Sequence, residues 1–236
     1  MRAGAPITLA VAALLAAAGC GGSSVADRPP ALRVLFVGNS LTAANDLPAA
    51  VARLAERAGG GPIAVEAVAP GGVSLEEHWR ETGARASLAR AGWDAVVLQQ
   101  GPSSLPASRS HLRRWARRWA DAVRAAGARP ALLQVWPETQ RAAAFPAVLA
   151  SYAGAARASG ALLLPAGAAW REALRRDPEL GLYGPDGFHP SERGTLLAAL
   201  VVHAGLTGRQ PAPPAGEEPA AARVLASAAA AALAGS

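Results

Sequence analysis

Five short apolar runs constrain the fold of this chain more than any other feature. They cover residues 32–37, 63–68, 95–99, 131–136 and 161–164, and each is followed within two residues by a glycine or a proline. Runs of this length and composition are typical of buried strands. Segments with helical patterns separate them, at about 45–58, 75–90, 109–126 and 146–158. This alternation predicts an α/β fold with a five-stranded parallel sheet covered by helices on both faces.

The segments that carry polar or glycine-rich chemistry all follow expected strands. Ser40 comes after the first run, Gly72 after the second and Gln100 after the third. Right-handed crossovers bring the carboxyl ends of parallel strands to one edge of the sheet, where open sheets of this type bind ligands. We therefore expect these three residues to converge at one edge.

The N-terminal residues predict a targeting segment rather than part of the fold. Arg2 precedes the apolar stretch 7–18, which is too short to span a bilayer as a permanent helix. It ends in Ala-Ala-Gly-Cys, which resembles a bacterial lipoprotein signal, a family in which cleavage before the cysteine is followed by its lipidation. We expect a signal peptide at 1–19, a flexible tether at 20–30 and one domain at 31–236. An ordinary secretory signal with an incidental cysteine is the alternative.

Lipidation of Cys20 implies an envelope protein anchored to a membrane on its periplasmic or extracellular face. Cys20 is the only cysteine, which excludes an internal disulfide and a multi-cysteine metal site. The rest of the sequence contains no stretch that predicts a spanning helix.

The net charge of +6 says little about partners, because every basic side chain is arginine and the chain is rich in alanine, which indicates a compositional bias. One expected helix carries an arginine cluster at Arg109, Arg113, Arg114, Arg117 and Arg118. Its apolar residues are spaced by three or four, at Leu112, Trp115, Trp119 and Val123. This pattern favours a packed helix with a solvated basic face. We therefore expect that the chain has no nucleic-acid partner. The alternative is that this basic face binds a nucleic acid or a lipid headgroup.

Three residues have the chemistry of a serine nucleophile and its activating groups. A serine hydroxyl needs a base to take its proton as it attacks, so Ser40 requires a histidine. Of the four histidines, only His189 has a carboxylate in an obvious orienting position, because Asp186 lies three residues earlier in a Gly/Pro loop. That spacing lets the carboxylate reach Nδ1–H and leaves Nε2 free. His78 is a weaker candidate, and His203 lies in an apolar run that is typical of the core.

An oxyanion formed by attack on a carbonyl needs hydrogen-bond donors aimed at it. The backbone N–H of Ser40 is one candidate. Gly72, in a Gly-Gly turn, can offer a second backbone N–H and lacks a Cβ that would obstruct a substrate. The side-chain amide of Gln100 is a third candidate.

At these residues the chain resembles the SGNH (GDSL-type) hydrolase superfamily of esterases and lipases. Gly-Asn-Ser-Leu at 38–41 is similar to its first block, Gly-Val-Ser at 72–74 to its second, and Asp-Gly-Phe-His-Pro-Ser at 186–191 to its last. The resemblance implies a three-layer α/β/α sandwich of flavodoxin-like type and ester hydrolysis without metal or cofactor. It also implies a triad of Ser40, His189 and Asp186.

The third block departs from the family pattern. Many members carry Gly-x-Asn-Asp there, whereas this chain reads Gln-Gln-Gly-Pro-Ser-Ser at 99–104. Counting from the glycine puts Ser103 at the position of the asparagine. Members similar to carbohydrate acetylesterases have Gln-Gly at this strand end, which favours Gln100 as the oxyanion donor, with Ser103 as the alternative.

These observations favour a serine esterase that hydrolyses a small acyl ester, such as an O-acetyl group on a glycan. A lipid ester is a competing substrate, and an acyltransferase would use the same residues. The alternative of another class is a catalytically weak envelope lipoprotein that binds a glycan or lipid, with Trp79 and Trp136 available for stacking on sugar rings. Ordinary core or rim packing is the favoured interpretation of both tryptophans. A metallohydrolase is disfavoured, because the four histidines are dispersed.

Overall fold

The computed structural model describes residue 1 and residues 32–59, 61–90 and 92–236. The predictions for the signal peptide, Cys20 and the tether lie outside the described residues. No helix in the described part of the chain is long and apolar enough to cross a membrane.

The five expected strands form one parallel sheet with the order β2-β1-β3-β4-β5. Their bounds are β1 Leu32–Val37, β2 Ile63–Val68, β3 Ala95–Leu98, β4 Arg129–Leu133 and β5 Leu162–Leu164. The first two agree with the sequence prediction. The fourth begins earlier and ends earlier than expected, because the chain leaves the sheet at Gln134, whose backbone and side-chain oxygens accept the N–H groups of Gly167 and Ala168.

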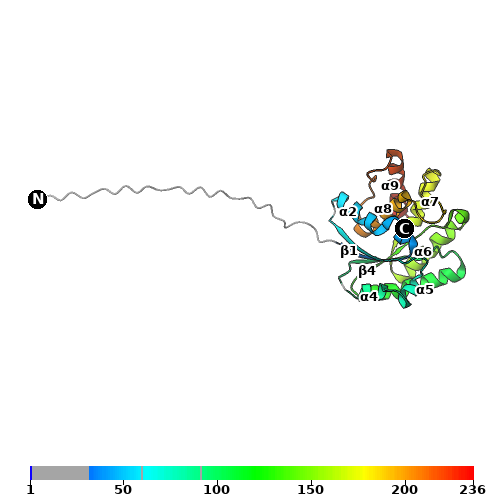
Figure 1. The fold of residues 1–236 in the computed structure, drawn as a ribbon, viewed down its shortest axis with the longest axis horizontal. Helices are drawn as coiled ribbons and strands as arrows, with labels where there is room; N and C mark the ends of the chain where they lie inside the picture. Colours follow the sequence, from blue (N-terminus) through cyan, green and yellow to red (C-terminus); the bar gives the residue numbers. More distant parts are fainter. Residues whose placement is uncertain (2–31, 60, 91) are drawn as a thin grey trace.

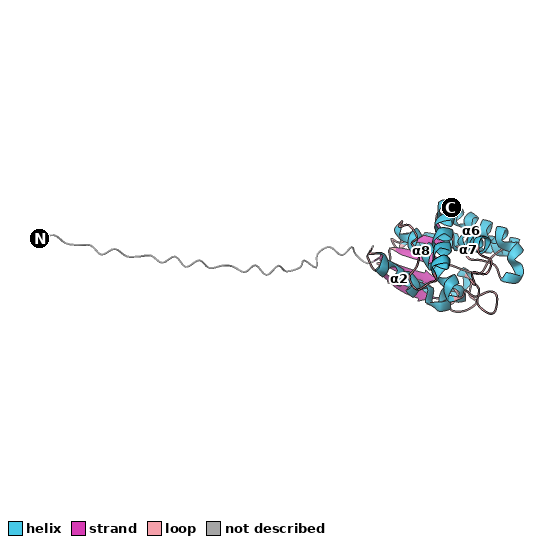
Figure 2. Ribbon diagram, turned by 90° about the horizontal axis from the view of Figure 1, so that it is seen from above, coloured by secondary structure: helices cyan, strands magenta, loops and turns pink. Residues whose placement is uncertain are grey.

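Two helical layers cover the sheet (Figures 1 and 2). One contains α2 Leu47–Ala58, α7 Ala166–Arg176, α8 Glu192–Thr207 and α9 Pro219–Ala234. The other contains α3 Leu75–Arg80, α4 Ala84–Ala89, α5 Pro106–Ala125 and α6 Phe145–Ser159. The arrangement confirms the expected three-layer α/β/α sandwich.

The apolar spacing on α5 packs this helix onto the sheet as expected. Leu112, Trp115, Trp119 and Val123 are all buried. The arginines between them, at 113, 114, 117 and 118, are exposed.

One expected helix is interrupted, and the helix expected at about 45–58 begins at Leu47, after a short helix and a turn that the sequence did not predict. The segment 75–90 divides into α3 and α4 around Thr82 and Gly83, where the Thr82 hydroxyl accepts the N–H of Ala84. The segment after Ser40 divides into α1 Ser40–Ala43, the 3₁₀ turn η1 Ala44–Asp46 and α2. Asn45 and Asp46 both have positive φ, which a continuous helix does not allow. Asp46 caps α2, accepting the N–H of Ala49 at 3.2 Å.

Candidate active site

Ser40 lies at the topological switch point of the sheet. Strand β1 has β2 on one side and β3 on the other, so the connections from β1 and β2 run in opposite directions and open a crevice at the strand ends. Ser40 is the first residue of α1, and Asn39 caps this helix by accepting the N–H of Leu41 at 3.1 Å. The Ser40 N–H and hydroxyl have no hydrogen-bond partner among the described residues, so both are available to a substrate.

The side chain of Gln99 holds the turn that carries Ser40. Its Oε1 accepts the N–H of Asn39 at 2.9 Å and the hydroxyl of Thr42 at 2.8 Å. Its Nε2 donates to Asn39 Oδ1 at 3.0 Å. Sequence reasoning missed this residue and singled out its neighbour Gln100. The available signal was its position at the end of the strand that pairs with β1.

His78 also supports this turn, and its ring nitrogens are not free to act as a base for Ser40. Its Nε2 lies 2.7 Å from the Gly38 carbonyl and its Nδ1 lies 2.9 Å from the Thr82 hydroxyl. A carbonyl only accepts, so Nε2 carries the proton and Nδ1 accepts from Thr82. The ring is fully buried, and burial lowers its pKa, which favours the neutral form. Both nitrogens are therefore engaged in holding the structure.

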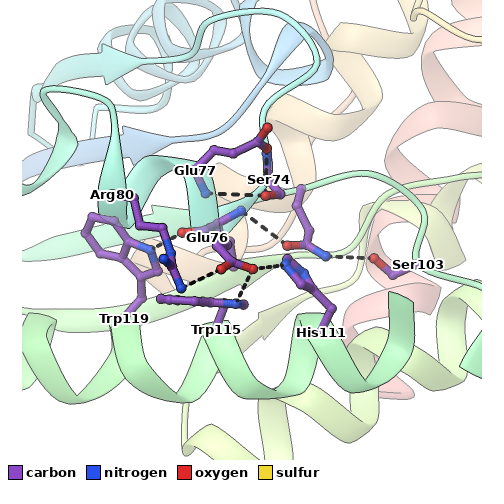
Figure 3. A network of polar contacts seen from close by, with 10 residues as sticks. Ser74, Glu76, Glu77, Arg80, Ser103, His111, Trp115 and Trp119 are labelled. Atoms are coloured by element: carbon purple, nitrogen blue, oxygen red, sulfur yellow. Dashed lines mark hydrogen bonds and ion pairs between the residues drawn. The ribbon is translucent and has the colours of Figure 1, made fainter. Parts of the chain in front are cut away.

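The residues at 72–74 are joined directly to the turn that carries Ser40. Asn39 Nδ2 donates to the Val73 carbonyl at 3.2 Å, which links the two loops that follow β1 and β2. Gly72 has a φ of 77°, which a residue with a side chain rarely adopts, and no atom lies within 4 Å of where its Cβ would be. Ser74 and Glu77 then form a capping box that starts α3 (Figure 3).

Gln100 and Ser103 contact one another. Gln100 is buried; its Oε1 accepts the N–H of Leu75 at 3.2 Å and its Nε2 donates to Ser103 Oγ at 2.9 Å. Ser103 in turn donates to the Gly101 carbonyl. A primary amide has two N–H groups, so Gln100 retains one beyond the bond to Ser103. Gln100 thus fastens α3 to the loop after β3 as well as being a candidate donor.

Asp186 and His189 form the pair that their spacing predicted. Asp186 Oδ2 lies 2.5 Å from His189 Nδ1, and Oδ1 accepts the N–H groups of Phe188 and His189. The hydrogen bond with His189, and then that with Phe188, lower the pKa of Asp186 to about 2, so it is ionised at neutral pH. A carboxylate at Nδ1 fixes the tautomer with Nε2 free of its proton. Nε2 has no hydrogen-bond partner among the described residues.

Asn45 joins the segment that follows Ser40 to the loop that contains His189. Its Nδ2 donates to the Pro190 carbonyl at 2.9 Å and to Thr195 Oγ1 at 3.0 Å. The residues that follow Ser40 and the residue that follows His189 are therefore in direct contact, although 145 positions separate them in the chain. Within the described residues, no hydrogen bond joins Ser40 Oγ to His189. Catalytic hydrogen bonds of this kind are often loose before substrate binds.

Trp136 is packed in the core, which confirms the favoured interpretation, and Trp79 is only partly exposed. Trp136 is 1% exposed, stacks on Trp170 at a centroid distance of 3.6 Å and donates to the Phe188 carbonyl. It therefore supports the loop that contains His189 from within the core. Trp79 is half-buried and packs edge-on against Trp119 in the α3–α5 layer.

The remaining two histidines are explained by packing. His203 is buried in α8, as expected for a core residue, and burial lowers its pKa. His111 is half-exposed on α5 and bonds Glu76 at 2.9 Å. In the part of the chain that the structure describes, no group of three or more His, Cys, Asp or Glu residues is placed to hold a metal ion.

Comparison with known proteins identifies solved structures with the same fold. No family model and no curated protein matches the chain. A protein from Slackia heliotrinireducens assigned to the SGNH hydrolases is 32% identical with a TM-score of 0.65; the match covers 76% of this chain and all of that one. A DUF4886 family protein from Bacteroides uniformis is 20% identical with a TM-score of 0.70, covering 86% of this chain and 95% of that one.

A lipase/acylhydrolase from Enterococcus faecalis is 14% identical with a TM-score of 0.61, and the match covers 76% of this chain and 98% of that one. At these lower identities the second and third likenesses concern the fold alone.

Proposed function

The chain belongs to the SGNH hydrolases, and on this basis we propose that it is a serine esterase with Ser40 as nucleophile, His189 as base and Asp186 as the orienting carboxylate. The observation that carries the proposal is the 2.5 Å contact between Asp186 Oδ2 and His189 Nδ1, with Nε2 left free. This is the arrangement that a histidine needs to accept a serine proton.

In the proposed mechanism, Ser40 Oγ attacks the carbonyl carbon of an ester as its proton passes to His189 Nε2. The tetrahedral intermediate collapses, and His189 returns the proton to the departing alcohol. Water then attacks the acyl-enzyme with His189 again as base, releasing the acid and restoring Ser40. Asp186 remains ionised throughout and stabilises the imidazolium.

We assign the oxyanion hole to the N–H groups of Ser40 and Gly72 and to the second N–H of Gln100, with Ser103 as the alternative third donor. The free N–H at the start of α1 and the open space beside Gly72 support this assignment. Removing one such donor typically costs about 10²–10³ in turnover.

For the substrate we propose a small acyl ester, with an O-acetylated glycan as the preferred class. The Gln-Gly sequence at 100–101 and the envelope location expected from the N-terminal segment support this choice. The proposal includes lipidation at Cys20. The experiment must separate this proposal from three alternatives. They are a lipid ester as substrate, transfer of the acyl group to another alcohol, and glycan or lipid binding with weak catalysis.

The test is hydrolysis of p-nitrophenyl esters of increasing acyl length and of acetylated sugars by the wild type and by the Ser40→Ala and His189→Ala variants. We expect acetate release that both substitutions reduce to near background with unchanged melting temperature. Preference for long acyl chains would favour a lipid ester, and acyl transfer to added alcohol would favour a transferase. Equal, low rates in all three proteins would overturn the proposal and favour the binding function.

A further inference from the structure

Five exposed arginines on one outer face of the molecule have no acidic partner. None of them lies within 4 Å of a carboxylate in the described part of the chain. They are Arg85 on α4 and Arg113, Arg114, Arg117 and Arg118 on α5. We refer to these five residues as the arginine patch. Arg85 and Arg118 both lie over the ring of Trp79, at 4.9 Å and 4.5 Å from its centroid, which makes the patch continuous across the two helices.

The acidic residues of the neighbouring helices are already engaged. Glu76 on α3 bonds Arg80 at 2.8 Å, His111 at 2.9 Å and the indole of Trp115 at 3.1 Å (Figure 3). Glu77 closes the capping box with Ser74. On α5 itself, Asp121 pairs with Arg124 at 2.8 Å. Glu81, which directly follows α3, is exposed and forms no ion pair in the described part of the chain, so no carboxylate pairs with the arginine patch.

The patch is also unfavourable for the helix that carries it. Arg113 with Arg117, and Arg114 with Arg118, are like charges four residues apart, a spacing that destabilises an isolated helix. In the opposite layer Arg175 and Arg176 on α7 both bond Glu172, whereas Arg53 on α2 and Arg223 on α9 are exposed and form no ion pair, but these two lie on separate helices. An excess of arginine over acidic residues accounts for unpaired arginines in general, and the arginine patch is distinguished by four of them on one helix and by the contacts of Arg85 and Arg118 with Trp79.

The surroundings of Trp79 match the chemistry of a membrane interface. A hollow of about 380 Å³ lies beside its ring and is lined by apolar residues that include Leu88 and Ala122, with Arg85 as the cation. Indole rings and the apolar stems of arginine are favoured at the headgroup level of a bilayer, with the guanidinium groups toward phosphate. A single-stranded nucleic acid would use an aromatic face for stacking, and here Arg85 and Arg118 already lie over the ring of Trp79.

We propose that the arginine patch docks on a bilayer surface that contains anionic phospholipids. The guanidinium groups contact headgroup phosphates, which accept paired N–H bonds from arginine, and Trp79 lies at headgroup depth. The patch is on α4 and α5, which lie together in one helical layer (Figure 1), whereas Ser40 begins α1 directly after β1. Docking through the patch therefore need not involve the candidate active site. This proposal does not depend on lipidation of Cys20.

The test is co-sedimentation of the full chain with vesicles of phosphatidylglycerol mixed with phosphatidylcholine, and with vesicles of phosphatidylcholine alone. The patch variant is Arg114→Gln/Arg117→Gln. The control variant is Arg53→Gln/Arg223→Gln, which removes two exposed arginines from the opposite layer. Both variants share the same N-terminal segment, so any contribution from it cancels. Their melting temperatures should match the wild type.

We expect the wild type to prefer the anionic vesicles, with a preference that declines as salt is added. Each arginine removed from the patch should weaken binding to anionic vesicles about fivefold, whereas the control variant should bind as the wild type does. Equal affinity for the two kinds of vesicle, or equal weakening in both variants, would overturn the proposal. Tighter binding to a DNA duplex or single-stranded RNA than to the anionic vesicles at the same salt would overturn it in favour of a nucleic-acid partner.

Discussion

At the scale of single residues, the candidate site is held together by side chains that bond one another rather than the substrate. Gln99 fixes Asn39, Asn39 reaches the Val73 carbonyl, and Asp186 holds His189. The groups left free are those that a reaction would use, namely the hydroxyl and N–H of Ser40 and Nε2 of His189. Preorganisation of this kind reduces the reorganisation needed when charge develops in the transition state.

We predict that turnover depends more on the negative charge of Asp186 than on its ability to accept hydrogen bonds. Asp186→Asn preserves the size of the side chain but loses the charge that stabilises the imidazolium and favours the reactive tautomer. We expect turnover to fall by about 10³–10⁴ with little change in melting temperature. Steady-state kinetics on p-nitrophenyl acetate provide the measurement.

Asp177→Asn is the matched control, because Asp177 also accepts the N–H of the residue two positions later, at 3.0 Å. It should leave turnover unchanged. A tenfold or smaller loss in Asp186→Asn, or an equal loss in both variants, would show that Asp186 is only a turn residue.

Substitutions can distinguish whether Gln100 or Ser103 is the third oxyanion donor, because the two side chains make different contacts. Gln100→Ala deprives both Leu75 N–H and Ser103 of a partner, so we expect lower turnover and also lower stability. Ser103→Ala leaves the Leu75 contact in place and should retain most of the turnover. Loss of turnover in Ser103→Ala with normal turnover in Gln100→Ala would assign the third oxyanion donor to Ser103.

At the scale of elements, the connection from β1 to α1 is the most constrained part of the fold. The Gly38 carbonyl accepts a hydrogen bond from His78 on α3, and the Asn39 N–H donates to the side chain of Gln99, directly after β3. Strand β1, helix α3 and the end of β3 therefore together determine where the first turn of α1 lies. Changes in this connection should affect activity and stability together.

Gly38→Ala tests this coupling directly. A Cβ at Gly38 would overlap the Thr42 hydroxyl and the side chain of Gln99, so the turn must shift. We expect a loss of about 1–3 kcal/mol in the free energy of unfolding, measured by urea denaturation, and a large loss of esterase activity.

The control for this change is Gly83→Ala, where no atom lies within 4 Å of the added Cβ and φ is −73°. It should leave both stability and activity near the wild type. An active, fully stable Gly38→Ala protein would contradict the description of this turn.

His78 should make stability depend on pH. Burial lowers its pKa, whereas an unfolded histidine titrates near 6.5. As pH falls below that value, the unfolded state takes up a proton that the folded state excludes, so the free energy of unfolding should decrease. His203 contributes in the same direction, because burial lowers its pKa too.

The measurement is urea unfolding at about pH 8 and about pH 5.5, on either side of the pKa of an unfolded histidine. His78→Gln should lose less stability on acidification than the wild type, and the double variant with His203→Gln should lose less again. An identical pH dependence in all three proteins would contradict the account.

At the scale of the whole molecule, the sequence predicted the layers and the edge at which the site lies, but not the contacts that build it. The strands could be predicted because each apolar run is followed closely by glycine or proline. The Asp186–His189 pair could be predicted because the two residues are only three positions apart. The roles of Gln99 and His78 depend on contacts with residues 60 and 40 positions away, which no local pattern encodes. Packing of Trp136 in the core could be favoured from the sequence, but its stacking partner Trp170 could not be predicted, because it is remote in sequence.

The central claim is that Ser40 becomes a nucleophile through His189 and Asp186. Fluorophosphonate labelling, followed by proteolysis and mass spectrometry to locate the adduct, tests it most directly. We expect one adduct on Ser40 in the wild type, and none in folded Ser40→Ala or His189→Ala protein. An adduct on another residue, or unchanged Ser40 labelling in folded His189→Ala protein, would contradict the claim.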